Sequence, residues 1–161
     1  MANTQAMCTS FLGEILTATH NFGTAPIRAV TTPDVFKAAL YLTSATVNAS
    51  TTAYSASNEV SGTGYTAGGV TITGSPAWNA PTATNSSVTA GTAFTTPTAS
   101  ITYTTVTLTT AFDSVLIYNS TQSDKAVSVH TFGSQTITAG TFTLTMPTNN
   151  TSTALLRLAT T

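Results

Sequence analysis

The stretch from Ile101 to Met146 reads ITYTTVTLTTAFDSVLIYNSTQSDKAVSVHTFGSQTITAGTFTLTM, and it decides the fold class of this chain. In its last part Phe142 and Leu144 alternate with threonines, which is the period-two pattern of a half-buried antiparallel strand. Val115–Tyr118 has no polar interruption, so we expect a central strand covered on both faces. Turn residues separate these runs, and the stretch predicts four or five short strands. Six side chains are expected in the core: Val115, Ile117, Val127, Val129, Phe142 and Leu144.

The apolar alternation within this stretch slips by one residue. Ile101 and Tyr103 are odd-numbered, whereas Val106 and Leu108 are even-numbered. One extra residue near Thr104 or Thr105 would restore a common inward face, and a β-bulge supplies it.

Period two also marks strands outside this stretch. It begins at Phe36–Leu42, returns at Val70–Thr73 after a glycine-rich turn, and ends with Ala154–Leu158. Residues 75–98 are small and interrupted by prolines, so we expect a long surface excursion with one or two short edge strands. The predicted fold is a single antiparallel β-sandwich or jelly-roll-like domain of about eight strands with one N-terminal α-helix.

Residues 4–20 have a helical period instead of a period of two. Their apolar side chains form one stripe, which predicts a helix over this range. The stripe packs either on the protein's own sheet or on a neighbouring subunit. We therefore expect an N-terminal helical segment over residues 1–24 and a β-sandwich domain over residues 25–161. The stripe consists of Met7, Cys8, Phe11, Leu12, Ile15 and Leu16.

The composition narrows the range of partners. Only 6% of the 161 residues are charged, 41% are hydrophobic, about a quarter are threonine, and the net charge is −1. Threonine suits a pleated surface that stays wet without charge. The four basic residues are scattered singly, so we expect no nucleic-acid partner. A free protein with so little net charge is poorly protected against association and precipitation. The composition therefore favours a protein that is bound in an assembly.

The chain lacks the usual signals of membrane insertion and export. No apolar stretch approaches the roughly 18 residues of a membrane-spanning helix, and the N-terminus lacks the pattern of a signal peptide. We therefore expect a product made and kept in a cytoplasm, with no membrane partner.

The search for catalytic chemistry is largely negative. The five carboxylates stand apart in the sequence, and neither His20 nor His130 lies in a catalytic motif. Cys8, His20 and Asp34 could be imagined as a nucleophile constellation, but a thiol on an apolar stripe is usually inert. We expect no enzymatic activity, no catalytic residues, no metal site and no cofactor.

Two segments suggest a family. FKAALYLTSATVNASTTAYSASNEVSGTGYTAGGV (36–70) and LIYNSTQSDKAVSVHTFGSQTITAGTFTLTMP (116–147) resemble small Thr- and Gly-rich structural proteins of tailed bacteriophages. The resemblance covers roughly residues 30–158 and has no catalytic signature. It implies a virion component without enzymatic activity, made in the host cytoplasm. Capsid decoration proteins, neck proteins and tail proteins share this composition, so no active-site residue is carried over.

Within this resemblance we expect a capsid decoration or cement protein that stabilises the head shell. A neck or tail component and a surface carbohydrate-binding module are the alternatives, and Trp78, Tyr65 and Tyr54 are the candidate sugar-binding aromatics. Decoration of a symmetric shell predicts a homotrimer bound to the major capsid protein or other virion proteins. The expected interface is apolar and consists of Phe11, Leu12, Ile15, Leu16, Val70 and Ile72.

Overall fold

The computed structural model describes residues 3–16, 19–22, 32–84 and 91–159, without the Leu16 side chain. This part of the chain is mainly β, with two antiparallel sheets and one short N-terminal helix, so the predicted fold class is confirmed. The chain forms two compact units. Residues 1–20, 34–71 and 102–143 make the first, and residues 21–33, 72–101 and 144–161 make the second. This division differs from the expected segments 1–24 and 25–161, because the N-terminal residues join the first sheet.

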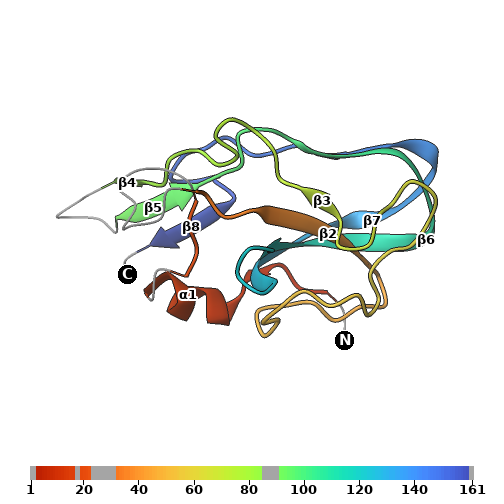
Figure 1. Ribbon diagram of the computed structural model, residues 1–161, viewed down its shortest axis with the longest axis horizontal. Helices are drawn as coiled ribbons and strands as arrows, with labels where there is room; N and C mark the ends of the chain where they lie inside the picture. Colours follow the sequence, from red (N-terminus) through yellow and green to blue (C-terminus); the bar gives the residue numbers. More distant parts are fainter. Residues whose placement is uncertain (1–2, 17–18, 23–31, 85–90, 160–161) are drawn as a thin grey trace. The chain divides into compact units, whose positions relative to one another are not determined.

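The first unit is built on a five-stranded sheet with the order β1-β7-β6-β2-β3. Figure 1 shows β6 beside β2 and the short β3 beyond it. The five strands are β1 (Ala6–Met7), β2 (Phe36–Leu42), β3 (Val70–Thr71), β6 (Ile101–Asn119) and β7 (Lys125–Leu144).

The longest elements are β6 and β7, with 19 and 20 residues. The prediction of four or five short strands in this region was therefore wrong. Gly133 and Gly140 lie within β7. The chain reverses only at residues 120–124, where Ser123 and Asp124 take positive φ values of 55° and 57°.

The predicted β-bulge in β6 is confirmed at Thr105, which has a φ of 54°. The extra residue brings the odd-numbered and even-numbered apolar side chains to a common inward face, since Ile101, Tyr103, Val106 and Leu108 are all buried. β6 also passes through the centre of the sheet between β7 and β2, and all four residues of Val115–Tyr118 are buried.

The predicted core is correct for four of its six side chains. Val115, Ile117, Val127 and Val129 are buried. Phe142 and Leu144 are only half-buried, so their placement in the core was wrong. They lie in the part of β7 that has a neighbouring strand on one side only.

The predicted helix over residues 4–20 is too long. α1 spans Thr9–Leu16, because the preceding residues pair with β7 instead, with Ala6 opposite Val129. The buried ring of Phe11 meets the His20 ring edge to face at 4.8 Å, and His20 stacks near Phe36 of β2. The apolar stripe of α1 thus packs, through Phe11, on the protein's own first unit.

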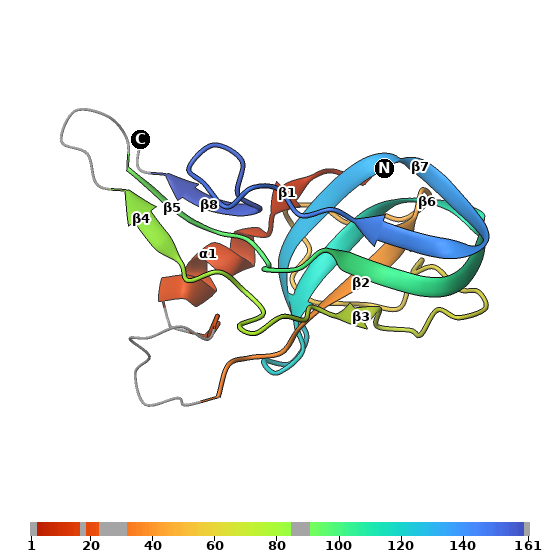
Figure 2. The ribbon, with the colours of Figure 1, turned by 90° about the horizontal axis from the view of Figure 1, so that it is seen from above.

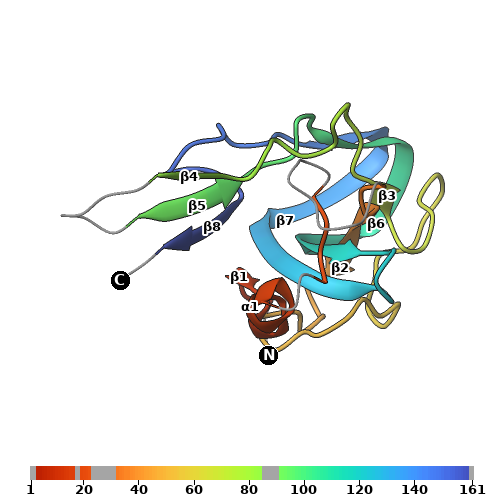
Figure 3. The same ribbon diagram turned by 60° about the vertical axis from the view of Figure 1, so that its left-hand side comes forward.

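The second unit contains a three-stranded sheet with the order β4-β5-β8 (Figure 3). Its strands are β4 (Thr82–Thr84), β5 (Thr92–Thr95) and β8 (Leu156–Ala159). β4 and β5 both arise from the excursion at residues 75–98, where one or two short edge strands were predicted. β4 lies at an edge of this sheet, whereas β5 is its central strand. Trp78 is buried in this unit and meets Phe22 edge to face at 5.0 Å.

Candidate functional site

The expected apolar interface is mostly enclosed by the chain itself. Phe11 and Ile72 are buried, Ile15 and Val70 are half-buried, and Leu12 is 45% exposed. The side chain of Leu16 lies outside the described residues. The structure therefore leaves Leu12 as the one side chain of this set, among those it describes, that offers a large apolar area to a partner.

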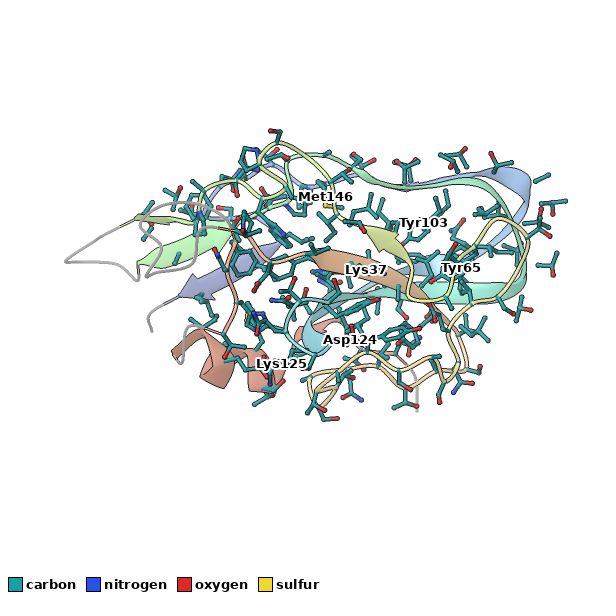
Figure 4. All side chains as sticks on the ribbon, in the orientation of Figure 1. Lys37, Tyr65, Tyr103, Asp124, Lys125 and Met146 are labelled. Atoms are coloured by element: carbon teal, nitrogen blue, oxygen red, sulfur yellow. The ribbon has the colours of Figure 1, made fainter. Side chains whose placement is uncertain are left out.

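A buried histidine links α1 to the turn between β6 and β7. His20 Nε2 lies 2.7 Å from Glu14 Oε2, and Lys125 Nζ donates to the other oxygen of Glu14 at 2.7 Å. The Asn119 amide donates to His20 Nδ1 at 3.0 Å and to Asp34 Oδ2 at 2.7 Å. Because an amide nitrogen can only donate, His20 Nδ1 must accept and Nε2–H must donate to Glu14. Figure 4 shows Lys125 near α1.

The electrostatics of this cluster favour a neutral histidine. Burial lowers the pKa of His20, although the hydrogen bond that His20 donates to Glu14 acts against it. Burial raises the pKa of Glu14, but the hydrogen bonds from Lys125 and His20 outweigh it and lower this pKa overall. Protonation of His20 would place a donor against the Asn119 donor. The cluster is thus a clamp that depends on one tautomer.

The imagined constellation of Cys8, His20 and Asp34 does not assemble as a nucleophile. Asp34 and His20 both accept hydrogen bonds from the Asn119 amide, and the Cys8 thiol is not part of this group. The Cys8 thiol lies 4.0 Å from the Asn48 carbonyl oxygen, and burial, followed by the nearby Glu14, raises its pKa to about 11. The thiol is therefore protonated at neutral pH, and a protonated thiol is a poor nucleophile.

A second cluster surrounds the buried carboxylate of Glu59, which is 8% exposed. Tyr54 donates to Glu59 Oε2 at 2.6 Å, while Tyr65 and the Gly68 N–H donate to Oε1 at 2.7 and 2.8 Å. Tyr118 in turn donates to the Gly68 carbonyl at 2.8 Å. Charge-assisted bonds of this kind are among the strongest in proteins. They fix the loop from 53 to 69 on the sheet.

Four of the five tyrosines of the chain belong to this network, and the fifth, Tyr41, donates to the Ser55 carbonyl of the same loop. Tyr54 stacks on Tyr118 and Tyr65 stacks on Tyr103, with ring centroids 4.8 and 5.9 Å apart. Figure 4 labels Tyr65 and Tyr103 on the first unit. Burial raises the pKa of each of these four hydroxyls, and it raises that of Tyr41 to about 12. The hydroxyls therefore act as donors that hold structure, not as bases.

The three candidate sugar-binding aromatics serve the fold instead. Trp78 is 1% exposed, so it presents no ring face to a sugar. Tyr54 and Tyr65 are half-buried, and their hydroxyls are bound to Glu59. An open pocket of about 250 Å³ does lie beside the Glu59 loop. Its lining is uncharged and consists of Tyr41, Ala45, Thr46, Val47, Thr51, Ala53, Ser55, Ser57 and Asn58.

The feature that sequence reasoning missed is the outer side of β7. Figure 2 shows β7 curving along the outside of β6. β1 pairs with β7 only at Ser128 and Val129, and no other described strand pairs with this side. A long edge of backbone N–H and C=O groups is therefore open. The signal was present in the sequence, since no charged residue and no proline occurs from 126 to 146.

No group of three or more His, Cys, Asp and Glu side chains among the described residues is placed to hold a metal ion. No helix in the described ranges is both long enough and apolar enough to span a membrane.

No protein-family model, no curated protein and no solved structure matches the chain.

Proposed function

We propose that this chain is a non-enzymatic structural protein of a tailed-bacteriophage virion, and that it decorates and stabilises the capsid shell. The proposal starts from the resemblance of residues 36–70 and 116–147 to Thr- and Gly-rich phage structural proteins. It gains support from the surface of the first unit, which offers an open strand edge and uncharged threonines to a partner.

The observation that carries the proposal is that charged side chains bind to other groups within the protein. Glu14 pairs with Lys125, and the carboxylates of Asp34 and Glu59 are buried among hydrogen-bond donors. Arg157 donates to the carbonyl oxygens of Thr151 and Ser152. Charges that hold loops in place are not available to steer a charged substrate or a polyanion. Recognition then rests on backbone pairing and apolar burial, as in a protein built into a lattice.

The proposed assembly is a homotrimer on the major capsid protein, because a threefold oligomer matches the repeated threefold positions of a shell. The resemblance alone does not distinguish a head protein from a neck or tail protein. No specific feature of the described residues favours the neck or tail.

Copy number tests the proposal. Quantitative mass spectrometry of purified virions of the encoding phage should find hundreds of copies per particle if the chain decorates the head. A dozen copies or fewer would overturn decoration in favour of the neck or tail. Absence from purified virions would overturn the virion proposal altogether.

A further inference from the structure

The open edge of β7 begins where β1 ends. Met7 lies opposite Ser128 and Ala6 lies opposite Val129, after which the N-terminal chain turns away and Thr4 donates to the Val47 carbonyl. From residue 130 onward β6 is the only neighbour of β7 among the described strands. An unpaired edge of this length is a template for another strand.

The backbone pattern shows which residues point outward from this edge. The Cys8 N–H donates to the Val127 carbonyl oxygen at 3.0 Å, so Val127 directs its backbone groups away from β6. In an antiparallel ladder this direction repeats every second residue. A positive φ of 53° at Ala139 then ends the regular stretch. The outward-facing residues are therefore Thr131, Gly133, Gln135 and Ile137.

Solvent covers most of this stretch. Residues 133–136 are exposed, and a Cβ added at Gly133 would meet nothing within 4 Å. The Gly133 carbonyl accepts a hydrogen bond from the Gln135 side chain at 3.0 Å, a local bond that an incoming strand can replace. Lysines and prolines usually protect such an edge. Residues 126–146 contain neither, and they contain no acidic residue.

We propose that the edge of β7 from Thr131 to Ile137 pairs with the same edge of a second copy of this chain. The strands at the ends of the two sheets, β1, β3, β4 and β8, have two, two, three and four residues, so the part of β7 beyond β1 is the long edge that each copy offers. Around a twofold axis, the backbone N–H and C=O groups of one β7 edge pair with those of the other. Both edges are then used, so no further copy can add and no fibre forms. Because the strand is uncharged, pairing of two copies places no like charges opposite each other.

The geometry selects one register. A twofold axis perpendicular to a continuous sheet keeps its faces, so outward-facing residues must pair with outward-facing residues. All four of them find partners only when Thr131 lies opposite Ile137 and Gly133 lies opposite Gln135. Ser134 then faces Ser134 of the second copy in a non-hydrogen-bonded pair, where Cα atoms lie about 4.5 Å apart. This contact does not depend on the virion proposal, and it can join two trimers as well as two monomers.

Cysteine cross-linking tests the register. Ser134→Cys should form a disulfide-linked dimer under mild oxidation, because its Cα separation falls within the range of about 4.4–6.8 Å that disulfides need. Gln135→Cys, one residue away and equally exposed, faces Gly133 and should cross-link much less. Cys8 is buried and does not compete. Equal cross-linking of the two variants, or none in either, would overturn the register.

Removal of one outward N–H tests the contact itself. Gln135→Pro deletes an N–H that faces away from β6, so the hairpin should survive, whereas the second copy loses a donor and meets the proline ring. Gln135→Thr keeps the N–H and is the matched control. In sedimentation, the proline variant should have half the mass of wild type, and the threonine variant the full mass. Similar urea midpoints show that both variants are folded. A monomeric wild type, or a proline variant that is folded and keeps the wild-type mass, would overturn the contact.

Discussion

Glu59 shows how one buried carboxylate can hold a long loop. Replacement by Gln keeps the size of the side chain but turns one acceptor oxygen into a donor amide, which then faces a tyrosine hydroxyl or the Gly68 N–H. We expect Glu59→Gln to lower the free energy of unfolding by about 1–3 kcal/mol, the cost of unsatisfied buried groups. Urea denaturation of both proteins measures this change.

The control for Glu59→Gln is Tyr54→Phe, which deletes one donor and leaves the carboxylate with two others. Its cost should be smaller, about 0.5–1.5 kcal/mol. Equal costs for the two variants would contradict the central role of the carboxylate.

Two leucines of the hairpin test how burial varies along it. Leu116 is fully buried in β6, the central strand of the five-stranded sheet, whereas Leu144 is half-buried at the end of β7. Leu116→Ala should cost about 2–5 kcal/mol, and Leu144→Ala clearly less, because solvent and neighbours can fill its site. Chemical denaturation of the pair checks the order. A Leu144 variant that loses as much stability as the Leu116 variant would show that the end of β7 is covered.

At the scale of elements, the clamp around His20 makes the attachment of α1 sensitive to acid. The pKa values of His20 and Glu14 are lowered, and burial lowers that of His130 to about 4. The unfolded chain, with a histidine pKa of about 6.5, then binds protons first, so stability is present above about pH 6.5 and declines toward pH 4. Urea midpoints across this range should fall in wild type.

Variants separate the two histidines in this response. His20→Phe keeps a ring between Phe11 and Phe36 but removes one titrating group, and His130→Gln removes the other. Each should flatten the acid decline in part, and the double variant should flatten it most. A wild-type midpoint that stays constant from about pH 6.5 to pH 4 would contradict this linkage.

Local patterns predicted the elements well where one face is buried. Phe36–Leu42 and the bulge at Thr105 could be found because apolar residues mark the inward side directly. The helix was drawn too long, since pairing of Ala6 with Val129 depends on a strand more than a hundred residues away. The hairpin of β6 and β7 was predicted as several short strands, because glycine and threonine also occur in turns. In the structure, pairing with β6 keeps Gly133 in an extended strand.

The candidate sites were harder to predict for the same reason. Nothing in the spacing of Glu14, His20 and Asn119 indicates that they meet. Tyr54 and Tyr65 bind Glu59, and the rings that stack on them come from β6. For the open edge of β7, the sequence shows only that residues 126–146 lack charged residues and proline. It does not show that most of β7 has a neighbouring strand on one side only.

For the whole molecule, the five tyrosines report on folding in alkali. Their pKa values are all raised, so their contribution to stability is complete below the unfolded value of about 10 and is lost as the pH rises above it. We expect little tyrosinate absorbance near pH 10 and then a steep rise that coincides with unfolding by circular dichroism. Denatured protein should titrate gradually around pH 10. A gradual titration of the folded protein would contradict burial of the network.

The scarcity of charge makes a last prediction about association. The chain has four basic and five acidic residues, and most of those described are engaged within the protein. Contacts made by backbone pairing and apolar burial should not weaken when salt rises to about 1 M, where screening acts beyond about 3 Å. Sedimentation of the free protein at low and high salt should therefore give the same mass, and shells decorated with the protein should retain it. Dissociation in high salt would mean that the few remaining charges, and not the strand edge, hold the copies together.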